Sequence, residues 1–108
     1  MVDHHIIENF LESLASEKGL SKNTIKSYKL DLIKLFEKIQ NKDSKELKKI
    51  DVEKYIRDLF DKGFERSTIL RKISSLGHFF DFLVEERLIS QNIIKQVSEG
   101  IKKKSPNA

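Results

Sequence analysis

The stretch ERSTILRKISSLGHFFDFLVEE, residues 65–86, decides the fold of this chain. Its apolar residues recur every three or four positions, which predicts one amphipathic helix that begins around residues 65–67 and ends near Glu86. The apolar stripe comprises Ile69, Ile73, Leu76, Phe80, Leu83 and Val84. A helix of about 20 residues is long enough to be the centre of a bundle, so partner helices are expected on either side of it.

Two helices are predicted on the N-terminal side. The first covers residues 3–18 and stops at Gly19, a residue that readily ends a helix in the left-handed conformation. The second starts with Ser21 as its N-cap and ends near Gln40. Its stripe consists of Ile25, Tyr28, Leu32, Leu35, Phe36 and Ile39.

Two more helices complete the expected set. After a connector at residues 45–50, Asp51 is the expected N-cap of a third helix that Gly63 closes. Residues 90–92 interrupt the apolar pattern, and a short last helix follows before the basic tail at residues 102–106. The sequence therefore predicts an all-α bundle of four or five helices.

Composition excludes several classes of protein. The chain has 108 residues, which suits one domain, and it contains no Cys, which excludes disulfides, thiolate zinc sites and a Cys nucleophile. No apolar run reaches the roughly 20 residues that span a bilayer, and the first residues lack the pattern of a signal peptide. We expect a cytoplasmic domain without membrane contact.

The net charge of +4 is unevenly distributed along the chain. Residues 1–17 carry −4, whereas residues 18–49 carry +6, residues 66–76 carry +3 and residues 91–108 carry +3. The positive charge therefore falls on the second helix, the start of the fourth helix and the tail. Acidic segments between them lower the total.

Helical-wheel positions gather these charges onto faces. Lys22, Lys26 and Lys29 lie within about 60° of one another on the second helix. The fourth helix presents a second polar face, away from its stripe, that consists of Ser67, Arg71, Ser74, Ser75 and His78. Cations neutralise phosphates and hydroxyls hydrogen-bond to them, so these faces fit a nucleic-acid backbone. The alternative is a helical protein-interaction module whose Lys-rich face is only solvated.

Two blocks of sequence resemble a known family. The first is IENFLESL at residues 7–14, EKGLSKNTIKSY at residues 17–28 and Asp31-Leu32; the second is Ser67-Thr68, RKISSL at residues 71–76 and FFDFL at residues 79–83. In this order they resemble the N-terminal core-binding domain of tyrosine recombinases of the Xer and phage-integrase type, a SAM-like domain. The resemblance covers roughly residues 5–93.

The resemblance implies a role and a set of site residues. In that family the domain forms half of a clamp on duplex DNA, with its second and fourth helices toward the major groove. Carried onto this chain, with the basic faces added, the expected DNA-binding residues are Ser21, Lys22, Thr24, Lys26, Lys29, Ser67, Arg71, Lys72, Ser75 and His78. Further recombinase protomers on paired sites are the other expected partners. The acidic residues Glu8, Glu12 and Glu17 could meet a neighbouring protomer.

Two positions depart from the family pattern. Gly77 stands where the family usually carries Arg or another polar residue, and Asn92-Ile93 replaces the usual Asn-Pro. A Gly inside a helix costs about 1 kcal/mol relative to Ala. These departures leave open how tightly the fourth helix is built and how the chain leaves it.

The resemblance also implies that this chain is not an enzyme by itself. The family's Tyr nucleophile and its Arg and His groups belong to a C-terminal domain that the chain lacks, whereas Tyr28 and Tyr55 lie on apolar stripes. We expect no catalytic residue, no metal at His4-His5 and no cofactor. The expected organisation is a helical DNA-binding domain at residues 1–98 and a basic linker at residues 99–108, in a fragment of a longer recombinase.

Overall fold

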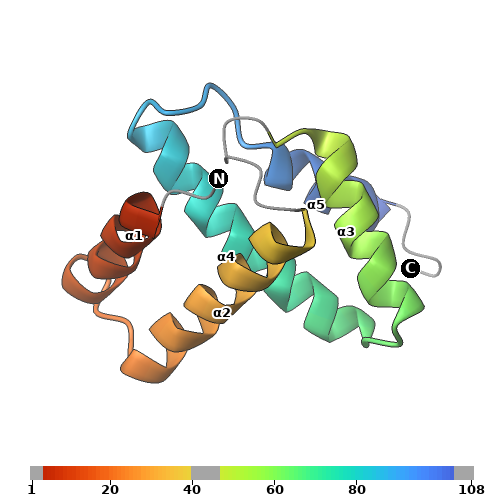
Figure 1. Ribbon diagram of the computed structural model, residues 1–108, viewed down its shortest axis with the longest axis horizontal. Coiled ribbons are helices and arrows are strands. Elements are labelled where there is room, and N and C mark those ends of the chain that lie inside the picture. Colours follow the sequence, from red (N-terminus) through yellow and green to blue (C-terminus); the bar gives the residue numbers. More distant parts are fainter. Residues whose placement is uncertain (1–3, 40–46, 104–108) are drawn as a thin grey trace.

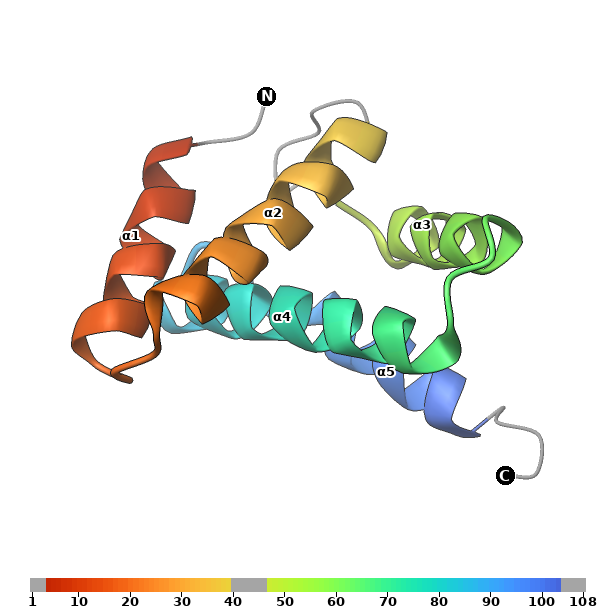
Figure 2. The same cartoon turned by 90° about the horizontal axis from the view of Figure 1, so that it is seen from below.

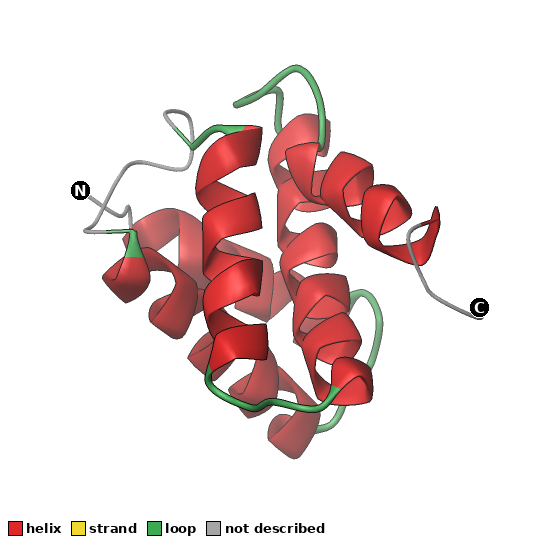
Figure 3. Cartoon of the chain, turned by 90° about the vertical axis from the view of Figure 1, so that its right-hand side faces the viewer, coloured by secondary structure: helices red, strands yellow, loops and turns green. Residues whose placement is uncertain are grey.

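The computed structural model describes residues 4–39 and 47–103, and these residues form five helices. The helices are α1 (His4–Ser16), α2 (Lys22–Lys38), α3 (Lys49–Asp61), α4 (Arg66–Glu85) and α5 (Ile93–Lys103). No strand occurs within these two ranges (Figure 3). The prediction of an all-α bundle is confirmed, with five helices.

The fold is organised around α4, as the length of its apolar stripe predicts. This helix runs diagonally through the middle of the molecule, with α1 and α2 on one side and α3 and α5 on the other (Figure 1). It packs against α2, α3 and α5, while α1 packs against α2 and α3 against α5. In the view from below, α2 crosses α4 obliquely (Figure 2).

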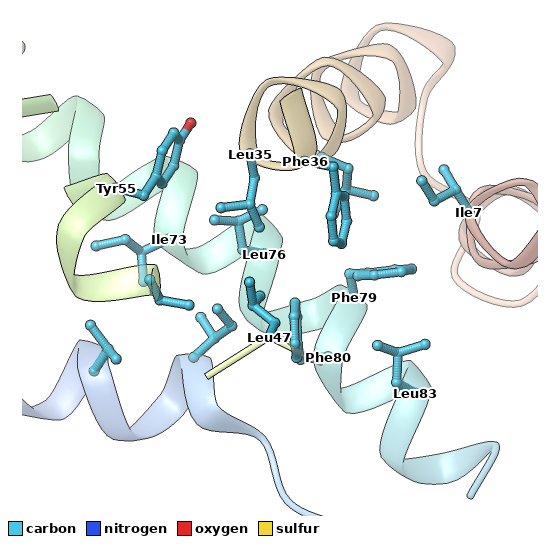
Figure 4. Close-up of a cluster of buried hydrophobic side chains, with 14 of the residues drawn as sticks. Ile7, Leu35, Phe36, Leu47, Tyr55, Ile73, Leu76, Phe79, Phe80 and Leu83 are labelled. Carbon is cyan, nitrogen blue, oxygen red and sulfur yellow. The ribbon is translucent and has the colours of Figure 1, made fainter. Parts of the chain in front are cut away.

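The core forms where these helices meet. Its largest fully buried side chains include Phe79 and Phe80 of α4, and Leu32 and Leu35 of α2. Rings from three helices contact one another, since Phe79 meets Phe10 of α1 at 5.2 Å and Phe36 of α2 at 6.2 Å between ring centroids. Figure 4 shows this cluster of buried side chains. Burial of these stripes is the main force that holds the helices together.

Several expected core residues of α2 are less buried than the wheel predicts. Leu32 of that helix and Ile73, Leu76, Phe80 and Leu83 of α4 are buried. Ile25 and Tyr28 are only partly buried and pack against the edge of the core. The N-terminal half of α2 therefore lies over the rim of the bundle.

The helix ends use left-handed backbone conformations. Gly19 follows α1 with φ +60°, and Gly63 follows α3 with φ +91°, both as the sequence predicts. The amide of Phe64 donates back to the carbonyl of Leu59 at 3.2 Å, which satisfies a free carbonyl at the end of α3. Arg87 takes the corresponding place after α4, with φ +61°, although it has a side chain.

The helix starts agree with the sequence in one case and correct it in another. The hydroxyl of Ser21 accepts the amide of Thr24 at 3.2 Å, as expected of an N-cap. Asp51, expected as the N-cap of α3, lies inside that helix, which begins at Lys49. Its carboxylate accepts the amide of Lys48 at 3.0 Å, because an acid on the first turn can reach back to the capping residue.

The last helix is longer than expected. α5 continues to Lys103 and includes the start of the predicted tail, so the expected boundary between residues 98 and 99 falls inside it. Gln40 and the polar cluster at residues 41–44 lie outside the described residues, as do residues 1–3 and 104–108. Within the described ranges, no helix is both long and apolar enough to cross a membrane.

Candidate nucleic-acid interface

The polar face of α4 is exposed along one strip of side chains. Ser67, Arg71, Ser74 and His78 are all exposed, one helical turn after another. Lys72 and Ser75 are not part of this strip, because both are buried, at 6% and 3% exposure. The expectation that they lie on the outer face with Arg71 is therefore corrected: α2 covers the flank of α4 that carries them.

Lys72 and Ser75 are buried because they surround Asp31 of α2, which is 4% exposed. The Ser75 hydroxyl lies 2.7 Å from Asp31 Oδ2 and 2.9 Å from the Lys72 carbonyl oxygen. Lys72 Nζ pairs with Asp31 Oδ1 at 3.3 Å. Arg71 Nη1 reaches Asp31 Oδ2 at 3.5 Å from the solvent side. We call Asp31, Arg71, Lys72 and Ser75 the Asp31 cluster.

The Asp31 cluster places one carboxylate between two cations at the junction of three elements. A buried carboxylate is stable only when its charge is paired and hydrogen-bonded, and both conditions are met here. On its other side, Lys72 Nζ lies 5.6 Å above the centre of the Phe64 ring, a cation–π contact from the connection between α3 and α4. One cation balances Asp31 in the interior, so the charge of the second, Arg71, is left at the surface.

The charge of Asp31 also affects the pKa of Tyr55, which lies on a third helix, α3. Burial, together with the negative charges of Asp31 and Asp58, raises the pKa of Tyr55 to about 12. In Figure 4 its hydroxyl oxygen points away from the apolar cluster. The phenol is therefore held neutral, and its position on a buried stripe agrees with a packing role.

His78, at the far end of the exposed strip, is fixed by aromatic contacts. Its ring stacks on Tyr28 of α2 at 6.0 Å between centroids, and Tyr28 lies 6.2 Å from Phe10 of α1. Asp31 lies one turn after Tyr28, and its partner Arg71 lies two turns before His78. The two contacts together fix α2 against the edge of the exposed strip of α4.

The remaining predicted residues lie on α2. Ser21 and Lys22 are exposed at its N-terminus, where the Ser21 hydroxyl also lies 3.0 Å from that of Thr24. Lys26 is exposed, and neither it nor Lys22 pairs with a carboxylate within the described ranges. Lys29 instead meets Glu8 of α1 at 3.7 Å. An exposed pair of this kind contributes little stability, so Lys29 is easily released to another anion.

Asp31 is the member of this cluster that the charge pattern fails to reveal. On the wheel it looks like a lone acid among lysines, although it lies one turn from both Tyr28 and Leu35 at the margin of the apolar stripe. The signal for Lys72 was clearer, since it lies between Ile69 and Leu76 in helical spacing. A cation on an apolar stripe predicts a buried anion beside it, because a buried charge must be paired.

The interface offers cations and hydroxyls for binding. Its exposed groups are guanidinium, ammonium, hydroxyl and imidazole, which suit an anionic backbone. Among the described residues, no group of three His, Asp or Glu side chains is arranged to hold a metal ion. The side chain of His4 lies outside the described residues, so the expectation about His4-His5 is not tested.

Comparisons with known proteins fit this geometry. Residues 7–87 match the model of the family described as phage integrase, N-terminal SAM-like domain. The chain is 38% identical over 97 residues to the tyrosine recombinase XerC of Listeria monocytogenes, covering 86% of this chain and 32% of that protein. It is 34% identical over 92 residues to the tyrosine recombinase XerD of Oceanobacillus iheyensis, covering 82% and 31%.

A third relative is a tyrosine recombinase of Agathobacter rectalis, 33% identical over 91 residues, which cover 84% of this chain and 29% of that protein. The chain thus spans about a third of the length of the curated relatives that it matches. No solved structure matches it.

Proposed function

The chain belongs to the family of phage-integrase N-terminal SAM-like domains, and on this premise we propose that it binds duplex DNA as the core-binding part of a site-specific tyrosine recombinase. The DNA would lie against α2 and α4, with phosphates near Ser21, Lys22, Thr24, Lys26 and Lys29 and the groove near Ser67, Arg71 and His78. Lys72 and Ser75 would act from beneath, through the Asp31 cluster.

One observation carries the proposal. Arg71 projects 56% of its side-chain surface into solvent from the middle of an exposed strip, while one nitrogen of its guanidinium remains 3.5 Å from a buried carboxylate. Guanidinium has five N–H donors in a fixed plane, so the outer edge stays available for a phosphate or a base edge. Hydroxyls of Ser67 and Ser74 flank it on the same strip.

We propose no bond chemistry for this chain. The cleavage and rejoining of DNA that the name tyrosine recombinase implies would require residues outside the matched region, which covers the N-terminal domain. The division into a DNA-binding unit at residues 1–98 and a basic linker at residues 99–108 belongs to the same proposal. Recombinase protomers on paired sites would be its protein partners.

The experiment is a binding titration on a mixed-sequence duplex at salt concentrations from about 50 to about 200 mM. Binding through several phosphates makes the logarithm of the affinity fall linearly and steeply with the logarithm of salt. Arg71→Ala and Lys26→Ala should each weaken binding by about 1 kcal/mol or more. Lys26→Ala should also reduce the salt slope by roughly 1.

Lys54→Ala is the matched control, because it removes the same charge from an exposed site on α3 that lies among acids. It should change the affinity far less than Lys26→Ala. Absence of binding at low salt, or three variants that behave alike, would favour the helical protein-interaction module. That alternative has a specific surface, since Ile50 and Phe60 of α3 are 51% and 43% exposed.

A further inference from the structure

We infer that Asp31 is a positioning residue for DNA recognition: from its buried site it holds the Arg71 guanidinium in a fixed orientation toward the duplex. This inference rests on the proposed function. It assigns a role to an acid that touches no DNA itself, on a face where simple electrostatics would count any acid as unfavourable.

The geometry makes Asp31 a rigid anchor. Its carboxylate is held on one oxygen by Lys72 Nζ at 3.3 Å and on the other by the Ser75 hydroxyl at 2.7 Å. A hydroxyl has one proton, and the shorter, charged acceptor is the better partner for it. Lys72 and Ser75 are themselves buried, so the anchor has little freedom to move.

The same geometry makes Arg71 the solvent-exposed partner of that buried carboxylate. Its side chain is 56% exposed, whereas that of Asp31 is 5% exposed, so the pair bridges interior and surface. Because Lys72 already neutralises the charge of Asp31, the positive charge of Arg71 is not neutralised by its ion pair with Asp31. The Asp31–Arg71 ion pair, which we call the tether, therefore restricts the conformations of Arg71. It leaves both the charge and the outer N–H donors of the guanidinium available to the ligand.

Restricting a long side chain before binding lowers the entropy lost on binding. Immobilising a flexible side chain costs about two- to tenfold in affinity, which is the size of effect expected here. Loss of the tether therefore predicts a loss of DNA affinity. Loss of a negative charge near a polyanion predicts the opposite, a gain. The two explanations differ in sign.

The test is Asp31→Asn in the DNA titration described above. Asparagine keeps an acceptor for Ser75 but removes the charge that holds Arg71. We expect affinity for the mixed-sequence duplex to fall about two- to tenfold, although the chain gains one positive charge. In an Arg71→Ala background the same substitution should no longer weaken binding, because the side chain that Asp31 orients is gone. Equal or tighter binding by Asp31→Asn overturns the inference, as does an equal loss in both backgrounds.

A second variant guards against misfolding. Asp31→Asn leaves Lys72 buried without a counter-ion, so Asp31→Asn combined with Lys72→Met removes both buried charges and restores the parent net charge. This pair should lose the same two- to tenfold in affinity. Unchanged affinity in the double variant, with a parent-like thermal transition, overturns the inference.

A third measurement needs neither a variant nor DNA. The Nε–H group of Arg71 in the unaltered chain should have a high NMR order parameter, which indicates restricted motion. The Nε–H group of exposed Arg57 should have a low one. Equal mobility of the two overturns the tether. If the parent chain binds no duplex at low salt, the proposed function fails together with the inference. If the parent binds and Asp31→Asn binds equally well, only the inference fails.

Discussion

The two flanks of α4 are built by different chemistry. On one flank, the contact with α2 contains a buried carboxylate, a buried ammonium and a hydroxyl, with Arg71 at the rim. On the other, the contact with α5 is apolar at its centre, where Ile94 is fully buried and approaches Gly77, and the ion pair of Lys95 with Asp81, at 3.7 Å, is solvent-exposed. The α4–α5 contact fixes the fold, whereas the α2–α4 contact also sets the direction of a surface cation.

A single side chain organises the α4–α5 contact. Asn92 accepts the amides of Ile94 at 2.9 Å and Lys95 at 3.3 Å, and so caps α5. Its amide nitrogen donates to the Gly77 carbonyl at 3.0 Å and to Asp81 Oδ1 at 2.9 Å. The chain therefore leaves α4 in a defined geometry without the proline that the family pattern places after this Asn.

The largest effect should come from breaking the charged contact. Asp31→Ala strands the buried ammonium of Lys72, and removal of one partner of a buried pair costs about 3 to 5 kcal/mol. We expect the free energy of unfolding, measured by urea denaturation, to fall by that amount. Adding Lys72→Met should recover most of the loss. If the single variant proves as stable as the parent, the carboxylate is solvated and the two flanks are alike.

A smaller effect is expected from the α4–α5 contact. Asn92→Ala removes the cap of α5, which costs about 1 to 2 kcal/mol, and should lower the thermal midpoint while DNA affinity at low temperature stays at the parent value. Ser90→Ala, an exposed change in the same connection, is the control and should alter neither. A large loss of DNA affinity in folded Asn92→Ala would show that the α4–α5 contact also shapes the interface.

Gly77→Ala should strengthen the α4–α5 contact and leave the α2–α4 contact unchanged. A Cβ built on Gly77 lies 3.7 Å from Ile94 Cγ2, an ordinary van der Waals distance. Ala therefore fits and should stabilise the helix by up to about 1 kcal/mol, measured by urea denaturation. Gly63→Ala is the matched opposite, because φ there is +91° and the same change should destabilise. Destabilisation by both would mean that the α4–α5 contact is tighter than its geometry indicates.

The smallest effect concerns pH. Burial raises the pKa of Tyr55 to about 12, above its ordinary value of 10. The neutral phenol is favoured by folding, so this stability is fully present below about pH 10 and is lost as the pH rises toward 12. At about pH 10.5 the free energy of unfolding of the parent should be lower than at neutral pH by under about 1 kcal/mol. Tyr55→Phe should not show this loss. Urea denaturation at neutral and at alkaline pH measures the difference, and parallel losses in the two proteins would contradict it.

Sequence periodicity predicted the helices well because each apolar stripe is a local property. Gly19 and Ser21 were equally readable, since a helix end depends on a few adjacent residues. The Asp31 cluster could not be predicted in the same way, because its residues come from two different helices. A wheel separates the apolar side of α4 from its polar side, but it cannot tell that α2 covers the flank carrying Ser75 and leaves Arg71 exposed.

The order in which the chain is made gives the Asp31 cluster a further consequence. Asp31 precedes Arg71, Lys72 and Ser75 by 40 to 44 residues. A growing chain therefore displays this carboxylate long before its partners exist, whereas the contact of Phe10 with Tyr28 closes a much shorter loop. We expect α1 and α2 to associate early and the ion cluster to form late, as one of the last steps of folding.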